Sequence, residues 1–154
     1  MHSVNQITPF TCGLACIESV ATDLGISITQ CDMLIKYKQE LLADVPDYGD
    51  FGSTSPPLIQ TIWRNLGLNG AWTRDHDIPH VRNTVFANIN PKQAVLIFSN
   101  LEKRAWHCTR FIQLNGAHCV DLMVPVFHQP AAATLTFSFQ DLADWDFHYA
   151  VISR

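Results

Sequence analysis

The sequence lacks the features that mark several common protein classes. Its 154 residues contain no apolar stretch long enough to cross a membrane, no Cys-x-x-Cys pair and no internal repeat. Lys and Arg number only 10 against 14 Asp and Glu, and they form no cluster. These absences predict a protein with no membrane span, no metal or cofactor site of a common type, and no broad surface for nucleic acid.

Targeting and disulfide signals are also missing. The opening residues MHSVNQ have neither the basic region nor the apolar core of a signal peptide. The five cysteines are an odd number, and their spacing suggests no disulfide framework; they lie at positions 12, 16, 31, 108 and 119. We therefore expect free thiols in a reducing compartment.

What is present indicates one globular domain over residues 1–154. Hydrophobic residues make up 47% of the chain and charged residues only 16%, which is enough apolar material for a buried core. The first half has helical periodicity. Apolar residues at helical spacing and capping residues predict three helices, which run from Cys12 to about Leu24, from Thr29 to about Leu41, and from Pro56 to Leu66.

The second half predicts an antiparallel sheet with one short helix. Four segments have the apolar content of strands, and they cover residues 94–99, 107–114, 117–124 and 147–154. Asn115-Gly116 is the strongest hairpin signal in the chain, and residues 138–145 form a short helix pattern. Helices followed by an antiparallel sheet predict an α+β architecture, with N-terminal helices packed on a C-terminal sheet.

Cys12 stands where a reactive cysteine is favoured. A thiolate is stabilised at a helix N-terminus and beside a histidine, and Cys12 is at the expected start of the first helix. Gly13 follows it without a side chain, which would let a substrate approach the backbone closely. The alternative is that Cys12 is a small core residue, which is the usual role of a cysteine at such a position.

Two histidines compete for the role of general base. His107 opens a predicted strand, and His148 opens the last one. A two-residue turn at 115–116 would pair His107 with Val124, and Asp121 with Arg110. Asp121 would then lie about 10 Å along the sheet from His107. Contact between them would need a longer loop or a bulge.

These residues resemble the bacteriocin-processing peptidase family, papain-like domains that cut leader peptides after a Gly-Gly pair. The resemblance is carried by a Gln ahead of a Cys-Gly pair, a small residue in the helix, a strand-opening His and an Asp near a Pro: Gln6, Cys12, Gly13, Ala15, His107 and Asp121. The helix pattern SFQDLADW also resembles the short family helix that ends in Trp. The order of elements is similar over most of the chain.

Two positions depart from the family pattern. Thr11 precedes Cys12, where the family has Asp. Asp121 is followed by Leu-Met-Val-Pro, where the family has Asp directly before Pro. The aspartate is therefore the member of the pattern that this chain matches least.

The resemblance implies a role for each site residue. Cys12 would be the nucleophile, His107 its general base, and Asp121 the residue that orients His107. The side-chain amide of Gln6 and the backbone N–H of Cys12 would form the oxyanion hole. The implied activity is cleavage after small residues through a thioester, with no cofactor and no metal, on a protein or peptide substrate.

The family also suggests where the activity is used. Stand-alone relatives include toxin domains that a secretion system delivers into the cytoplasm of a competitor and that an immunity protein inhibits. We therefore expect a cytoplasmic protein, or one delivered into a target cell's cytoplasm. The alternatives are an acyl or glutamyl transferase on the same fold and an inactive domain that binds leader peptides. The acidic segment 44–52 is either a solvated loop or a border of the cleft.

Overall fold

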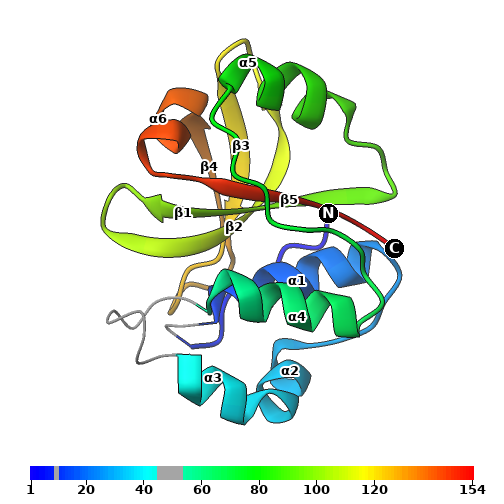
Figure 1. Cartoon of the computed structure of the whole chain (residues 1–154). Coiled ribbons are helices and arrows are strands. Elements are labelled where there is room, and N and C mark those ends of the chain that lie inside the picture. The colour runs from blue at the N-terminus through cyan, green and yellow to red at the C-terminus, as the bar shows by residue number, and fades with distance from the viewer. Residues whose placement is uncertain (9–10, 45–53) are drawn as a thin grey trace.

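The computed structural model describes residues 1–8, 11–44 and 54–154 (Figure 1). Four helices come first in the chain: α1 (Cys12–Asp23), α2 (Gln30–Lys36), α3 (Lys38–Asp44) and α4 (Pro56–Asn65). Three short helical turns follow, α5 (Ile78–His80), η2 (Val81–Val85) and η3 (Phe86–Asn88). The remaining elements are β1 (Gln93–Leu101), β2 (Ala105–Asn115), β3 (Cys119–Val124), β4 (Ala133–Ser138), α6 (Phe139–Asp144) and β5 (His148–Ser153).

The five strands form one antiparallel sheet. Their order across the sheet is β4-β3-β2-β1-β5, so the last strand of the chain pairs with the first one. Figure 1 shows α1 to α4 on one face of this sheet and α5 and α6 on the other. The α+β class and the placement of N-terminal helices against a C-terminal sheet are confirmed.

Each face of the sheet has its own hydrophobic core. The core under α1 and α4 combines helix residues such as Leu14 and Trp63 with Leu96 and Phe98 of β1. The opposite core combines Ile97 with residues of the other strands and of α6. Successive residues of β1 therefore point to opposite cores, which explains why residues 94–98 are all apolar.

The helices follow their sequence signals closely. Thr29 and Asp32 form the expected capping box, and Pro56 and Pro57 open α4 behind the cap Ser55. The predicted second helix is interrupted at Tyr37, where α2 ends and α3 begins one residue later. The elements β4 and α5 to η3 were not predicted. The central residues of β4 are exposed, so β4 has no clear apolar alternation.

The β2–β3 hairpin differs from the expected two-residue turn. Asn115 pairs with Cys119, so the turn contains residues 116–118 and the pairing is shifted along the strand. A bulge between Phe111 and Gln113 shifts it again, and Arg110 then pairs with Met123. Asp121 therefore lies opposite Gln113 instead of Arg110.

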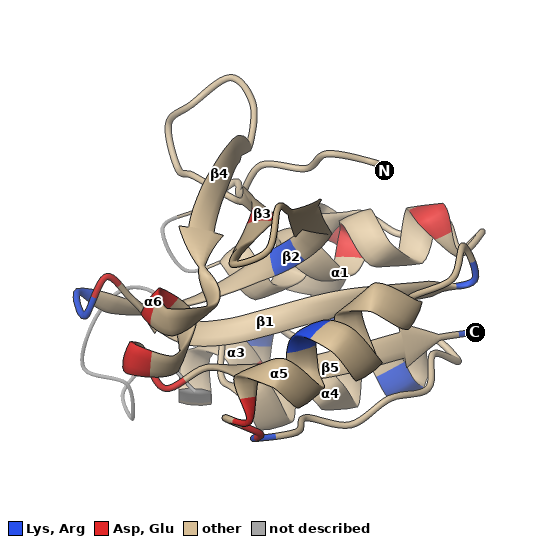
Figure 2. Ribbon diagram, turned by 90° about the horizontal axis from the view of Figure 1, so that it is seen from above, with Lys and Arg blue, Asp and Glu red and all other residues tan. Residues whose placement is uncertain are grey.

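Charged side chains are sparse on this fold. Figure 2 shows Lys and Arg scattered over separate helices, strands and loops, without a continuous basic band on the face in view. Within the described parts of the chain, no helix is both long enough and apolar enough to span a bilayer.

Candidate active site

Cys12 is the first residue of α1 and is fully buried. The preceding residue, Thr11, occupies the N-cap position, but its hydroxyl bonds to the backbone N–H and carbonyl of Thr8 instead of to the first turn of the helix. Unpaired N–H groups at the start of a helix favour a negative charge there. The local backbone thus places the Cys12 sulfur where a thiolate is stabilised.

His107 lies on β2, and its side chain is in hydrogen-bond contact with that of Cys12. The second contact of the ring is with the loop after β3, where Nε2 lies 2.8 Å from the carbonyl oxygen of Pro125. A carbonyl only accepts hydrogen bonds, so Nε2 carries a proton. Nδ1 is therefore the ring nitrogen left to exchange a proton with Cys12.

The surroundings of Cys12 favour its ionised form. Burial is the largest single influence and opposes ionisation of the sulfur. The charge of His107 and its hydrogen bond, with backbone hydrogen bonds from Cys108 and Gly13, outweigh burial and lower the pKa of Cys12. Cys12 is thus a candidate nucleophile. For Cys108, burial and its neighbours Cys16 and Cys12 have the opposite effect and raise the pKa.

The opposite shift occurs at His107. Burial alone would lower the pKa of His107, but the charge of Cys12, its hydrogen bond and the Pro125 carbonyl together raise it. A lowered thiol pKa beside a raised imidazole pKa favours a thiolate–imidazolium pair. Such a pair can attack a carbonyl carbon and then protonate a leaving amine.

Gln6 lies buried six residues ahead of Cys12. Its Nε2 donates to the carbonyl of Thr8 at 2.9 Å, which fixes the orientation of the amide group. A primary amide has two N–H groups, so one donor remains beyond the bond to Thr8. This is the chemistry that the predicted oxyanion role requires.

Gly13 has a different role from the one expected. A Cβ atom at this position would lie 2.8 Å from Cδ1 of Ile59 and 3.3 Å from Cβ of Thr54. The space beside Gly13 is thus filled by α4 and the residues before it. Gly13 lets α1 and α4 pack closely, and this close approach is the structural reason for a glycine here.

Asp121 is not brought to His107 by the structure. It pairs with Gln113, six positions along β2 from His107, or roughly 20 Å at the usual strand rise. Its carboxylate accepts hydrogen bonds from Gln113, Asn115 and Thr136 at 2.7–2.9 Å. The expected orienting role of Asp121 is therefore corrected to a structural one: the carboxylate ties β2, β3 and β4 together.

This network makes a prediction about stability at acid pH. The hydrogen bond from Asn115, followed by those from Gln113 and Thr136, lowers the pKa of Asp121. A depressed folded-state pKa stabilises the protein above the unfolded-state value, and this stabilisation is lost as pH falls through the folded-state value. We expect Asp121→Asn to lower the free energy of unfolding at neutral pH and to flatten its decline below pH about 4. Urea unfolding from neutral to acid pH measures both effects, and an unchanged pH profile would contradict the structural role.

His148, the rival base, lies on β5 at the far side of β1 from β2. Burial lowers its pKa, and the charges that act on it belong to Asp146, Arg74 and His76. Its ring lies edge-on to Trp106, with the centroids 6.5 Å apart. Among the described interactions of His148, none involves Cys12, so His107 is the histidine that the fold pairs with the thiol.

One member of the site was missed by sequence reasoning. The acceptor that orients the His107 ring is the backbone carbonyl of Pro125, and no side-chain pattern reveals a backbone acceptor. The only available signal was Pro125 itself, which follows the returning strand directly.

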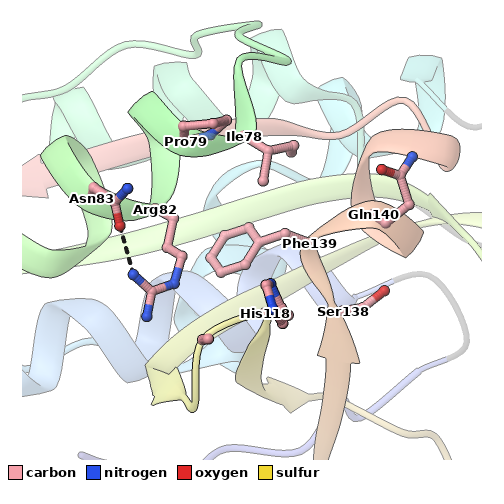
Figure 3. A pocket seen from close by; sticks show the side chains of 9 residues that line it. Ile78, Pro79, Arg82, Asn83, His118, Ser138, Phe139 and Gln140 are labelled. Atoms are coloured by element: carbon pink, nitrogen blue, oxygen red, sulfur yellow. Dashed lines mark hydrogen bonds between the residues drawn. The ribbon is translucent and has the colours of Figure 1, made fainter.

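A separate pocket of about 390 Å³ lies at the turn end of the β2–β3 hairpin. Figure 3 shows its lining, with Arg82 bonded to Asn83 and Phe139 forming the apolar floor. The lining residues come from α5, η2, the hairpin turn and α6: Ile78, Pro79, Arg82, Asn83, Ala117, His118, Ser138, Phe139 and Gln140. The pocket shares no residue with the Cys12–His107 pair. The described residues contain no group of three or more His, Cys, Asp or Glu placed to hold a metal ion.

Comparison with known proteins shows the fold. No protein-family model and no curated protein matches the chain. The peptidase domain of Streptococcus ComA, a bi-functional ABC transporter involved in quorum sensing, is 13% identical, with a TM-score of 0.67 over 99% of this chain and 98% of that domain. The Pseudomonas avirulence protein AvrPphB is 12% identical over 93% and 90% of the two chains, at a TM-score of 0.43. The chain therefore has the papain-like fold of the ComA peptidase domain over nearly its whole length.

Proposed function

We propose that this protein is a papain-like cysteine peptidase with Cys12 as nucleophile and His107 as general acid and base. The observation that carries the proposal is the hydrogen-bonded Cys12–His107 pair, in which the pKa of the thiol is lowered and that of the imidazole is raised. The fold shared with the peptidase domain of Streptococcus ComA supports the proposal, because that domain is a peptidase built on the same arrangement of helices and sheet.

In the first half-reaction, the Cys12 thiolate attacks the carbonyl carbon of the scissile peptide bond. The C–S bond forms, and the negative charge moves to the carbonyl oxygen. The remaining amide hydrogen of Gln6 and the N–H of Cys12 are the proposed donors to this oxygen. The tetrahedral intermediate then expels the amine, which takes its proton from Nδ1 of His107.

In the second half-reaction, water hydrolyses the thioester. Neutral His107 removes a proton from the water molecule, whose oxygen attacks the thioester carbon. Collapse of this intermediate breaks the C–S bond and regenerates the thiolate–imidazolium pair. Nε2 keeps its bond to the Pro125 carbonyl throughout, so the ring retains the orientation needed for both proton transfers.

For the substrate, we propose a peptide with small residues, such as Gly-Gly, before the cleaved bond. Cys12 has no exposed surface, so bulky side chains next to the scissile bond would have to displace more of its surroundings than glycine would. The resemblance to peptidases that cut leader peptides supports the same choice.

We also place the proposed activity in a reducing compartment. None of the five cysteines, all of which lie in the described parts of the chain, is in a disulfide, and a nucleophilic thiol is preserved where glutathione and thioredoxin keep thiols reduced. This condition is met in the cytoplasm of the producing cell, or in that of a target cell into which the protein is delivered. In the second case, a dedicated inhibitor protein would protect the producer.

A proteome-derived peptide library tests the proposed function. Wild-type protein and the Cys12→Ala variant are incubated with the library, and newly formed N-termini are sequenced by mass spectrometry. We expect cleavages that require Cys12, with glycine enriched before the cleaved bond. Absence of any cleavage specific to the wild type would overturn the peptidase proposal. Cleavage without enrichment of glycine would overturn only the substrate proposal.

A further inference from the structure

The Pro125–Val126 peptide group is bonded at both of its ends. Its carbonyl oxygen accepts from Nε2 of His107, and its N–H donates to Oδ1 of Asn5. A trans peptide group is planar, with its C=O and N–H pointing in opposite directions. Holding the N–H in place therefore fixes the direction of the carbonyl that orients His107.

Asn5 also anchors the chain beyond this peptide group. Its Nδ2 donates to the carbonyl oxygen of Gln129, so one side chain bonds to the backbone of the loop at two points. Oδ1 further accepts from the backbone N–H of Gln6 at 3.1 Å. The same amide group thus contacts the loop that orients His107 and the residue proposed to bind the oxyanion.

The backbone of Asn5 is itself held in place. Gln30, the first residue of α2 and almost fully buried, donates from Nε2 to the carbonyl oxygen of Asn5 at 2.6 Å. Its Oε1 accepts from the N–H of Ile7 at 3.2 Å. Gln30 therefore fixes the backbone on both sides of Gln6, and the side chain of Asn5 extends from a rigid segment.

We propose that Asn5 is a positioning residue that holds the Pro125–Val126 peptide group against His107, so that this peptide group replaces the side-chain carboxylate of a Cys-His-Asp triad. This inference rests on the proposed function. Consecutive hydrogen bonds polarise one another, so the bond from Val126 to Asn5 strengthens the carbonyl of Pro125 as an acceptor. Asn5 touches no reacting atom, and its effect on the titration of the Cys12–His107 pair acts through the bond between His107 and Pro125.

Few other groups can shift the titration of His107. The titratable group that faces His107 from α1 is Cys12. The residue that pairs with His107 across the β1–β2 ladder is Ser99, which carries no charge. Cys108, the next residue on β2, has a pKa raised by burial and by Cys16 and remains a neutral thiol. The carboxylate of Asp121 is hydrogen-bonded to Gln113, Asn115 and Thr136, away from His107. Asn5 and Pro125 contact the loop or the ring but carry no charge. A change at Asn5 should therefore be visible in the titration of the pair.

The test uses two substitutions with opposite expected effects. Asn5→Ala removes both bonds to the loop, which weakens the bond from His107 to Pro125 and should lower the pH above which the thiolate–imidazolium pair is lost. Asn5→Asp keeps an acceptor for the N–H of Val126 and adds a negative charge, which should raise that pH. Asn88→Ala is the matched control, because the side chain of Asn88 also bonds to the backbone at more than one point, at the carbonyls of Asn83 and Thr84, away from the pair.

The pair is followed by the ultraviolet absorbance of the Cys12 thiolate and by the rate of alkylation of Cys12 against pH, with Cys12→Ser as the blank. We also expect Asn5→Ala to lower kcat about 10- to 100-fold with little change in KM, as loss of an outer hydrogen-bond partner does at other sites. If the pH above which the thiolate–imidazolium pair is lost is the same in both Asn5 variants as in the wild type, the inference is overturned, even if kcat falls. A wild type that forms the pair but cleaves no peptide would overturn the proposed function and leave the positioning role standing. A wild type without the pair would overturn both.

Discussion

Replacing His107 with alanine is expected to lower kcat for peptide cleavage by at least roughly 10³-fold. The variant loses the largest influence that favours the Cys12 thiolate, because the charge and hydrogen bond of His107 lower the pKa of Cys12 more than its backbone hydrogen bonds do. It also loses the proton donor for the leaving amine. Kinetic assays on a peptide identified from the library measure the loss, and circular dichroism checks the fold. Added imidazole should restore part of the activity of His107→Ala.

His148→Ala is the matched control for this experiment. His148 is the first residue of β5, but its ring lies against Trp106, and the charges acting on it come from Asp146, Arg74 and His76. Its removal should leave kcat near the wild-type value. If activity were lost in His148→Ala and retained in His107→Ala, the assignment of the general base would be reversed.

The parts of this site that depend on local sequence patterns were predictable. A helix beginning at Cys12 follows from the apolar spacing of Leu14, Ile17 and Val20, and the run 94–99 identifies a strand buried on both faces. The pairing of Cys12 with His107 was proposed from the resemblance to the bacteriocin-processing peptidases. Periodicity and spacing alone left His148 open as the general base.

The orienting group was not predictable, since it depends on register. Placement of Asp121 relative to His107 changes with the length of the hairpin turn and with the bulge near Phe111, and neither is encoded by a clear sequence signal. The acceptor that His107 uses is a main-chain carbonyl, which every residue carries. Asn5 is far from His107 and Pro125 in sequence, so only the fold shows that it contacts the loop that contains Pro125.

Breaking the ion pair between α1 and β2 should lower the stability of the fold strongly. Arg110, whose side chain is only 7% exposed, contacts Asp23 at 2.8 Å and donates to the hydroxyl of Ser19. Asp23→Asn leaves a buried guanidinium without its counter-charge, and we expect the free energy of unfolding to fall by about 3 kcal/mol. Urea unfolding at neutral pH measures the change. The exposed pair of Glu102 and Arg104 supplies the control, because Glu102→Gln should cost less than about 1 kcal/mol.

A double substitution separates the loss of charge pairing from a general loss of packing. Asp23→Asn with Arg110→Met removes both charges and keeps an apolar chain of similar length between α1 and β2, so much of the stability should return. Arg110 is three residues from His107 on β2, and Asp23 is the last residue of α1, which begins at Cys12. Asp23→Asn should therefore also lower activity near its unfolding temperature by loosening the two elements that hold the pair together. A double variant no more stable than Asp23→Asn would show that Arg110 stabilises the fold through contacts other than its charge.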